Sequence, residues 1–67
     1  MNIVVNGKSR EVADQSRLSD LPELVEEQPS RGMAVALDGS VVPRTQVNQT
    51  RLHEGARVEI VTAVQGG

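Results

Sequence analysis

The sequence predicts a small α+β domain in which one main helix packs across a mixed β-sheet. Two strand-like hairpin patterns flank a single helix-like pattern, and the longest strand-like segment comes last. The chain has 67 residues, no aromatic residue and no cysteine, so a single aliphatic core must hold it together. A chain of this length buries only about 60% of the surface that its unfolded form exposes, which leaves little room for an enclosed active site.

The chain opens with a predicted β-hairpin. Ile3 and Val5 alternate with their neighbours as in a strand with one buried face. Asn6-Gly7 favours a type I′ turn, because both central residues of that turn need a positive φ. Ser9 to Ala13 is then the returning strand.

A helix is predicted next from apolar residues at spacings of three and four, which are Leu18, Leu21, Leu24 and Val25. Pro22 is tolerated only in the first turn, so the helix is expected to begin shortly before it. Ser19 is the preferred N-cap, with Ser16 as the second choice. The proline and glycine between Gln28 and Gly32 end the helix.

The remaining elements are a second hairpin, a crossing segment and a final strand. Met33 to Leu37 and Ser40 to Val42 pair around the turn at Asp38-Gly39. The polar segment from Arg44 to Thr50 is expected to form an irregular crossing or a turn of 3₁₀ helix. Arg57 to Val64 is rich in β-branched residues and suits the centre of the sheet. This order is that of the β-grasp, or ubiquitin-like, topology.

The composition excludes several classes of function. With 7 basic and 9 acidic residues, a net charge of −2 and no stacking aromatics, the chain is not expected to bind nucleic acid. No apolar run is long enough to span a membrane, and we expect a cytoplasmic protein. No metal site is expected either, because His53 is a single histidine in a predicted exposed loop. The cluster of Glu23, Glu26 and Glu27 is expected to face water.

The end of the sequence is its most informative part. Gln65, Gly66 and Gly67 follow the last strand directly, so we expect a domain over residues 1–64 and a flexible reactive tail over residues 65–67. Three extended residues reach about 10 Å. Glycines without Cβ atoms fit a narrow channel and could carry the carboxylate of Gly67 into the active site of another protein. A frayed end or a cloning scar is the alternative on the glycines alone.

Three segments of the chain resemble the ThiS family, the sulfur carriers of thiamin thiazole biosynthesis. They are MNIVVNGKSREV at residues 1–12, VALDGSVVPRTQ at residues 35–46 and LHEGARVEIVTAVQGG at residues 52–67. The most specific feature is the combination of Val42-Pro43-Arg44 after a turn with a terminal Gly66-Gly67.

The resemblance implies that this chain is a carrier and not an enzyme. An E1-like adenylyltransferase would use ATP and Mg²⁺ to adenylate Gly67, and no cofactor would be bound by the chain itself. Sulfur from a cysteine desulfurase or another donor would replace AMP, and the resulting thiocarboxylate would go to thiazole synthase. We expect a monomer, since a tail that enters different active sites in turn favours modest, transient interfaces.

Partner docking is expected from four further residues, which are Val4, Arg44, Val61 and Ala63. Arg44 follows Pro43, whose fixed φ would orient the arginine consistently. Val4, Val61 and Ala63 point away from the core, and they would form an exposed apolar patch if their strands are neighbours. Single surface aliphatics and a solvated arginine are the alternative interpretations.

Other functions stay open on the sequence. One is a related sulfur carrier, such as the small subunit of molybdopterin synthase, which would share the fold and the terminal glycines. Another is a ubiquitin-like modifier that is joined to lysines. The last is a non-reactive β-grasp binding module whose glycines are inert.

Overall fold

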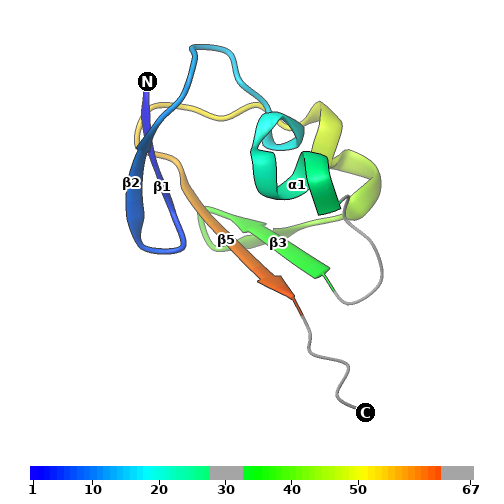
Figure 1. Ribbon diagram of the computed structural model, residues 1–67. Coiled ribbons are helices and arrows are strands. Elements are labelled where there is room, and N and C mark those ends of the chain that lie inside the picture. The colour runs from blue at the N-terminus through cyan, green and yellow to red at the C-terminus, as the bar shows by residue number, and fades with distance from the viewer. Residues whose placement is uncertain (28–32, 63–67) are drawn as a thin grey trace.

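A computed structural model describes residues 1–27 and 33–62 and contains one five-stranded sheet (Figure 1). The strands are β1 (Asn2–Val5), β2 (Lys8–Glu11), β3 (Met33–Leu37), β4 (Ser40–Val42) and β5 (Arg57–Thr62). Their order is β2-β1-β5-β3-β4, with β1 and β5 parallel and the other neighbours antiparallel. The predicted central position of the last strand is confirmed, and the arrangement is the β-grasp fold.

Three helical segments cover one face of this sheet (Figure 1). They are the 3₁₀ helix η1 (Leu18–Asp20), the α-helix α1 (Pro22–Glu27) and the 3₁₀ helix η2 (Arg44–Gln49). The predicted 3₁₀ crossing after the second hairpin is therefore confirmed. Among the residues that the structure describes, no helix has the length and apolar content needed to cross a membrane.

Both predicted hairpin turns have the backbone that their sequences favour. The φ angles are 51° at Asn6 and 84° at Gly7, and they are 51° at Asp38 and 88° at Gly39. Asparagine, aspartate and glycine tolerate this left-handed region better than other residues, so these dipeptides close tight turns between β1 and β2 and between β3 and β4.

The predicted start of the helix is wrong. Leu21 is extended, with φ −73° and ψ 135°, and it separates η1 from α1. Proline disfavours the α conformation in the residue before it, so Pro22 breaks the helical run at Leu21 and becomes the first residue of α1. Ser19 lies inside η1 and is not an N-cap, while Ser16 is buried and donates its hydroxyl to the carbonyl of Ala13 at 2.6 Å.

Two strand boundaries also differ from the prediction. The second strand is Lys8–Glu11 instead of Ser9 to Ala13, and β5 is described to Thr62. The predicted helix stop at residues 28–32 and the predicted last strand residues 63–64 lie outside the described residues.

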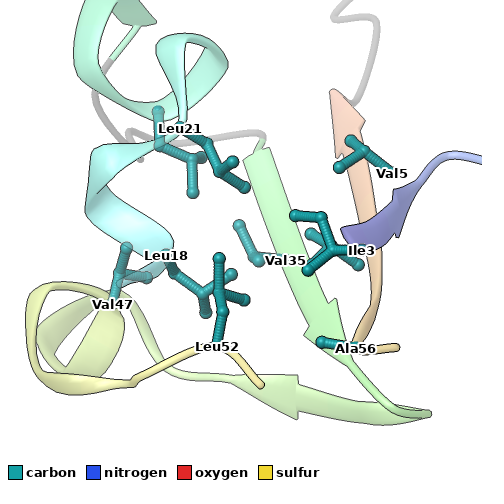
Figure 2. Close-up of a cluster of buried hydrophobic side chains, with 10 residues drawn as sticks. Ile3, Val5, Leu18, Leu21, Val35, Val47, Leu52 and Ala56 are labelled. Carbon is teal, nitrogen blue, oxygen red and sulfur yellow. The ribbon is translucent and has the colours of Figure 1, made fainter. Parts of the chain in front are cut away.

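The core between the sheet and the helical layer is entirely aliphatic (Figure 2). Its buried residues are Ile3, Val5, Leu18, Leu21, Leu24, Val35, Val47, Leu52, Ala56 and Val58. Burial of a side chain the size of valine or leucine contributes roughly 1.5–3 kcal/mol. Every structural element except β2 and β4 supplies at least one of these residues, so the sheet and helices depend on each other for stability.

An ion pair ties the first hairpin to the helix. The Arg10 guanidinium donates to both carboxylate oxygens of Glu23, at 2.9 and 2.6 Å. This bond lowers the pKa of Glu23 to about 2. Because both side chains are about one third exposed, solvent screens part of the interaction.

We predict that Glu23→Gln lowers the free energy of unfolding at pH 7 by about 0.5–1 kcal/mol, the range of partly exposed ion pairs. The pKa of Glu23 is depressed in the folded state, so this contribution is present above pH 4.5 and is lost as the pH falls toward 2. Denaturant melts at pH 7 and pH 2 measure the difference. Glu11→Gln is the matched control, and an equal effect of both variants would contradict a stabilising role for the Arg10–Glu23 ion pair.

A second ionic contact fixes the start of β5. His53 Nε2 lies 2.6 Å from Asp38 Oδ2, and His53 Nδ1 lies 2.9 Å from the carbonyl oxygen of Glu54. The other oxygen of Asp38 accepts the backbone N–H of Arg57 at 3.0 Å. The bond to Asp38, followed by the bond to Glu54, raises the pKa of His53, since only the doubly protonated ring can donate to both acceptors.

We predict that His53→Gln destabilises the protein more at pH 5.5 than at pH 9. The raised pKa means that the contribution of His53 is fully present below pH 6.5 and is lost as the pH rises through the folded-state value. Melting temperatures of both proteins across this range test the expectation. Asp38→Asn should show the same trend, and a difference that does not change with pH would refute the role of the charged pair.

Candidate functional site

The predicted reactive residues, Gln65, Gly66 and Gly67, lie outside the described residues, as does Ala63. The structure describes the strand that leads to them. On one side, β5 pairs with β3 along its length, from Leu37 opposite Val58 to Met33 opposite Thr62. On its other side, the Val4 N–H donates to the Ala56 carbonyl at 2.8 Å. Neighbouring strands therefore hold β5 from both sides up to its last described residues.

Asn6 extends this support beyond the end of β1. Its backbone N–H donates to the Val58 carbonyl at 2.9 Å. Its side-chain oxygen accepts the Ile60 N–H at 2.8 Å, and its side-chain nitrogen donates to the Ile60 carbonyl at 3.3 Å. The amide side chain thereby takes the place that another strand residue would occupy. The sequence analysis interpreted Asn6 only as a turn residue, and nothing in its local pattern signals this second role.

The sheet face opposite the helices carries an apolar area near the end of β5. We call Ala34, Ala36, Val41 and Val61 the outer apolar patch. Val61 is 60% exposed and Val41 is 74% exposed. The register places Ala34 opposite Val61 and Ala36 opposite Val41, so the four side chains share one face across β5, β3 and β4.

The prediction that Val4 and Val61 share one apolar patch is wrong, because the register of β1 and β5 separates them. β1 and β5 are neighbours, as expected, but Val4 lies opposite Arg57 and is half-buried. Val61 is four residues further along, about 13 Å, with Glu59 between them on the same face. The residues that share this face with Val61 are Ala34, Ala36 and Val41. Because residues 33–37 are all apolar, no alternation in the sequence indicates which of them face outward.

Arg44 lies at the same end of the sheet as Thr62. It is exposed and is the first residue of η2, after Pro43 with φ −60° and ψ 147°. Because β4 and β5 both run antiparallel to β3, they are parallel to each other, and the residues that follow them emerge at one end. His53 precedes β5 and therefore lies toward the opposite end.

The described part of the chain offers a surface and no metal centre. Within residues 1–27 and 33–62, no group of three or more His, Cys, Asp or Glu side chains is placed to hold a metal ion. Glu23, one of the three clustered glutamates, is held by Arg10.

Comparisons with known proteins agree with this description. The model of the ThiS family matches residues 3–67. The chain is similar to the crystal structure of the thiamine biosynthesis protein ThiS from Geobacter metallireducens, with 29% identity, a TM-score of 0.78 and full coverage of both chains. The solution structure of a thiamine biosynthesis protein from the same organism gives 28% identity and a TM-score of 0.72, with 100% of this chain and 88% of that chain covered.

No curated protein sequence matches the chain at a significant level. The family match nevertheless covers all of the sheet except Asn2 and continues through the predicted tail. The chain therefore belongs to the ThiS family of sulfur carriers in thiamine biosynthesis.

Proposed function

We propose that this chain carries sulfur to thiazole synthase as a thiocarboxylate on Gly67. The observation that supports this most directly is the family match, which runs through Gln65-Gly66-Gly67 at the end of the chain. An E1-like adenylyltransferase would activate Gly67, and a cysteine desulfurase or an equivalent donor would supply the sulfur. The cycle would run in the cytoplasm with the carrier as a monomer.

The chemistry begins with the terminal carboxylate. Its ordinary pKa of about 3.3–3.7 makes it an anion at neutral pH, so one of its oxygens can attack the α-phosphorus of ATP. Pyrophosphate leaves and an acyl adenylate forms. A persulfide from the sulfur donor then attacks the acyl carbon, AMP leaves with the electron pair of the C–O bond, and an acyl disulfide forms. A thiol then attacks the donor's sulfur, forms a disulfide with it and releases the thiocarboxylate on the carrier. The partner enzymes supply the catalytic groups, and this chain supplies the reacting atoms.

The fixed strand before the tail supports this role. Glycine has no Cβ, so Gly66 and Gly67 fit a channel that would exclude other residues. Three extended residues reach about 10 Å, which is enough to pass an enzyme's surface and reach its active site. Because hydrogen bonds hold Ile60 on the Asn6 side and β3 pairs with Thr62, the tail would begin from a defined position. Defining that position reduces the entropy lost when the tail binds.

The outer apolar patch is the docking surface that we propose for the adenylyltransferase. Val41 and Val61 are exposed aliphatic side chains on one face of the sheet, and burial of such side chains drives protein association. Arg44 lies at the same end of the sheet and would add a charged contact. Ala63 is part of the proposal from the sequence alone.

We predict that the protein isolated from cells carries a thiocarboxylate on Gly67, and that deletion of Gly67 abolishes it. Intact mass spectrometry detects the exchange of one oxygen for sulfur. The deletion variant should melt as the intact protein does, because the buried core residues that the structure describes run from Ile3 to Val58. A carboxylate that persists after incubation with ATP, Mg²⁺, a sulfur donor and the adenylyltransferase would favour the inert binding module instead.

We also predict that Val61→Asp weakens binding to the adenylyltransferase by tenfold or more, about 1.4 kcal/mol, while the fold is kept. Val61 is already 60% exposed, so the carboxylate can remain in water in the free protein. Isothermal calorimetry measures the affinity. Ser9→Asp is the control, since it adds the same charge to β2, away from the outer apolar patch. Equal affinities for both variants would remove the patch as a docking surface.

A further inference from the structure

Two arginines face each other on the side of the molecule that holds the helical segments. Arg17 and Arg51 form an isolated antiparallel bridge. The flanking hydrogen bonds run from the Leu18 N–H to the Thr50 carbonyl at 2.9 Å and from the Leu52 N–H to the Ser16 carbonyl at 2.8 Å. In Figure 1, the cyan segment that enters η1 and the yellow segment that leaves η2 run beside each other.

The register of this bridge directs both guanidinium groups into solvent. The hydrogen bonds belong to the residues on either side, so Arg17 and Arg51 are a non-hydrogen-bonded pair, in which Cα atoms lie about 4.5 Å apart and side chains share one face. Their neighbours Leu18 and Leu52 are buried in the core. Both arginines are exposed.

The two facing positive charges do not stabilise the domain. Like charges directly opposite each other on paired strands are destabilising. Among residues 1–27 and 33–62, no carboxylate forms an ion pair with either guanidinium. Asp20, three residues after Arg17, uses one carboxylate oxygen to accept the Arg17 backbone N–H at 2.8 Å.

The backbone around the bridge determines what kind of anion fits. The N–H groups of Arg17, Leu18 and Leu52 all donate to acceptors inside the domain, so they cannot converge on a small anion. Two guanidinium groups that extend into solvent remain. Each presents a planar set of donors that pairs with a carboxylate through two hydrogen bonds.

We propose that Arg17 and Arg51 form a docking contact for an acidic segment of a partner protein. Two carboxylates of such a segment would neutralise the positive charges of Arg17 and Arg51 and offset the repulsion between them. The contact lies apart from the last described residue of β5, because Arg51 leads into the start of that strand and β5 is about 20 Å long. It therefore stands or fails independently of the sulfur-carrier function.

The test compares two doubly substituted proteins that lose the same charge. Arg17→Gln with Arg51→Gln removes the proposed contact, and Lys8→Gln with Arg57→Gln removes two exposed charges elsewhere. Calorimetric titration at low ionic strength uses a hexaglutamate peptide as the acidic segment and inorganic phosphate as the small anion. We expect the peptide to bind the wild type and the control alike, with at least tenfold weaker binding to the Arg17/Arg51 variant and loss of binding at high salt.

Thermal melting separates docking from a structural role. Relief of the repulsion should leave the melting temperature of the Arg17/Arg51 variant equal to or above that of the wild type. A lower melting temperature would show that the arginines support the fold, and this would overturn the proposal. Peptide affinity equal to that of the wild type, or phosphate binding at the pair as tight as that of the peptide, would overturn it as well.

Discussion

The fold depends on the parallel pairing of β1 with β5. Without it, the β1–β2 hairpin would be separate from the three-stranded unit of β5, β3 and β4, and a single two-stranded hairpin is at best marginally stable in water. The pairing itself is short, with Val4 opposite Arg57 and Val5 opposite Val58. The side chain of Asn6 lengthens it, because its amide bonds to both backbone groups of Ile60. One residue thus closes the hairpin turn and joins the two halves of the sheet.

The aliphatic core explains why polar contacts at the surface matter in this domain. Its largest fully buried side chains are Ile3, Leu18, Leu21 and Val58, and no aromatic ring adds further apolar area. The net stability of a core of this size is a few kcal/mol, so contacts of about 1 kcal/mol are a large share of it. The pairs Arg10–Glu23 and Asp38–His53 are two such contacts, and each joins residues that are at least 13 positions apart in the sequence.

The sequence predicted the features that local chemistry determines. Asn6-Gly7 and Asp38-Gly39 specify their turns directly, and the β-branched content of Arg57 to Val64 indicated a central strand. The break at Leu21 was missed because helical periodicity continues across it, and the conformational limit comes from the following proline.

Other features depend on register and long-range packing, which one sequence does not reveal. Leu52 and Ala56 are buried although they lie in an irregular segment with no periodic pattern. The prediction that β1 and β5 are neighbours was correct. Their adjacency alone did not reveal the register, in which Val4 lies opposite Arg57 and away from Val61. The bridge between Arg17 and Arg51 joins two irregular segments, so no pattern in either one predicts it.

The bond between Asn6 and Ile60 spans 54 residues of a 67-residue chain, and this has a kinetic consequence. The entropy of closing a loop rises with its length, and proteins rich in distant contacts fold slowly for their size. Each hairpin can form as soon as its own strands exist, but the sheet cannot close until β5 has been synthesised. On the ribosome, the first hairpin must therefore wait for its parallel partner, and the domain gains its core in one late step that follows the synthesis of β5.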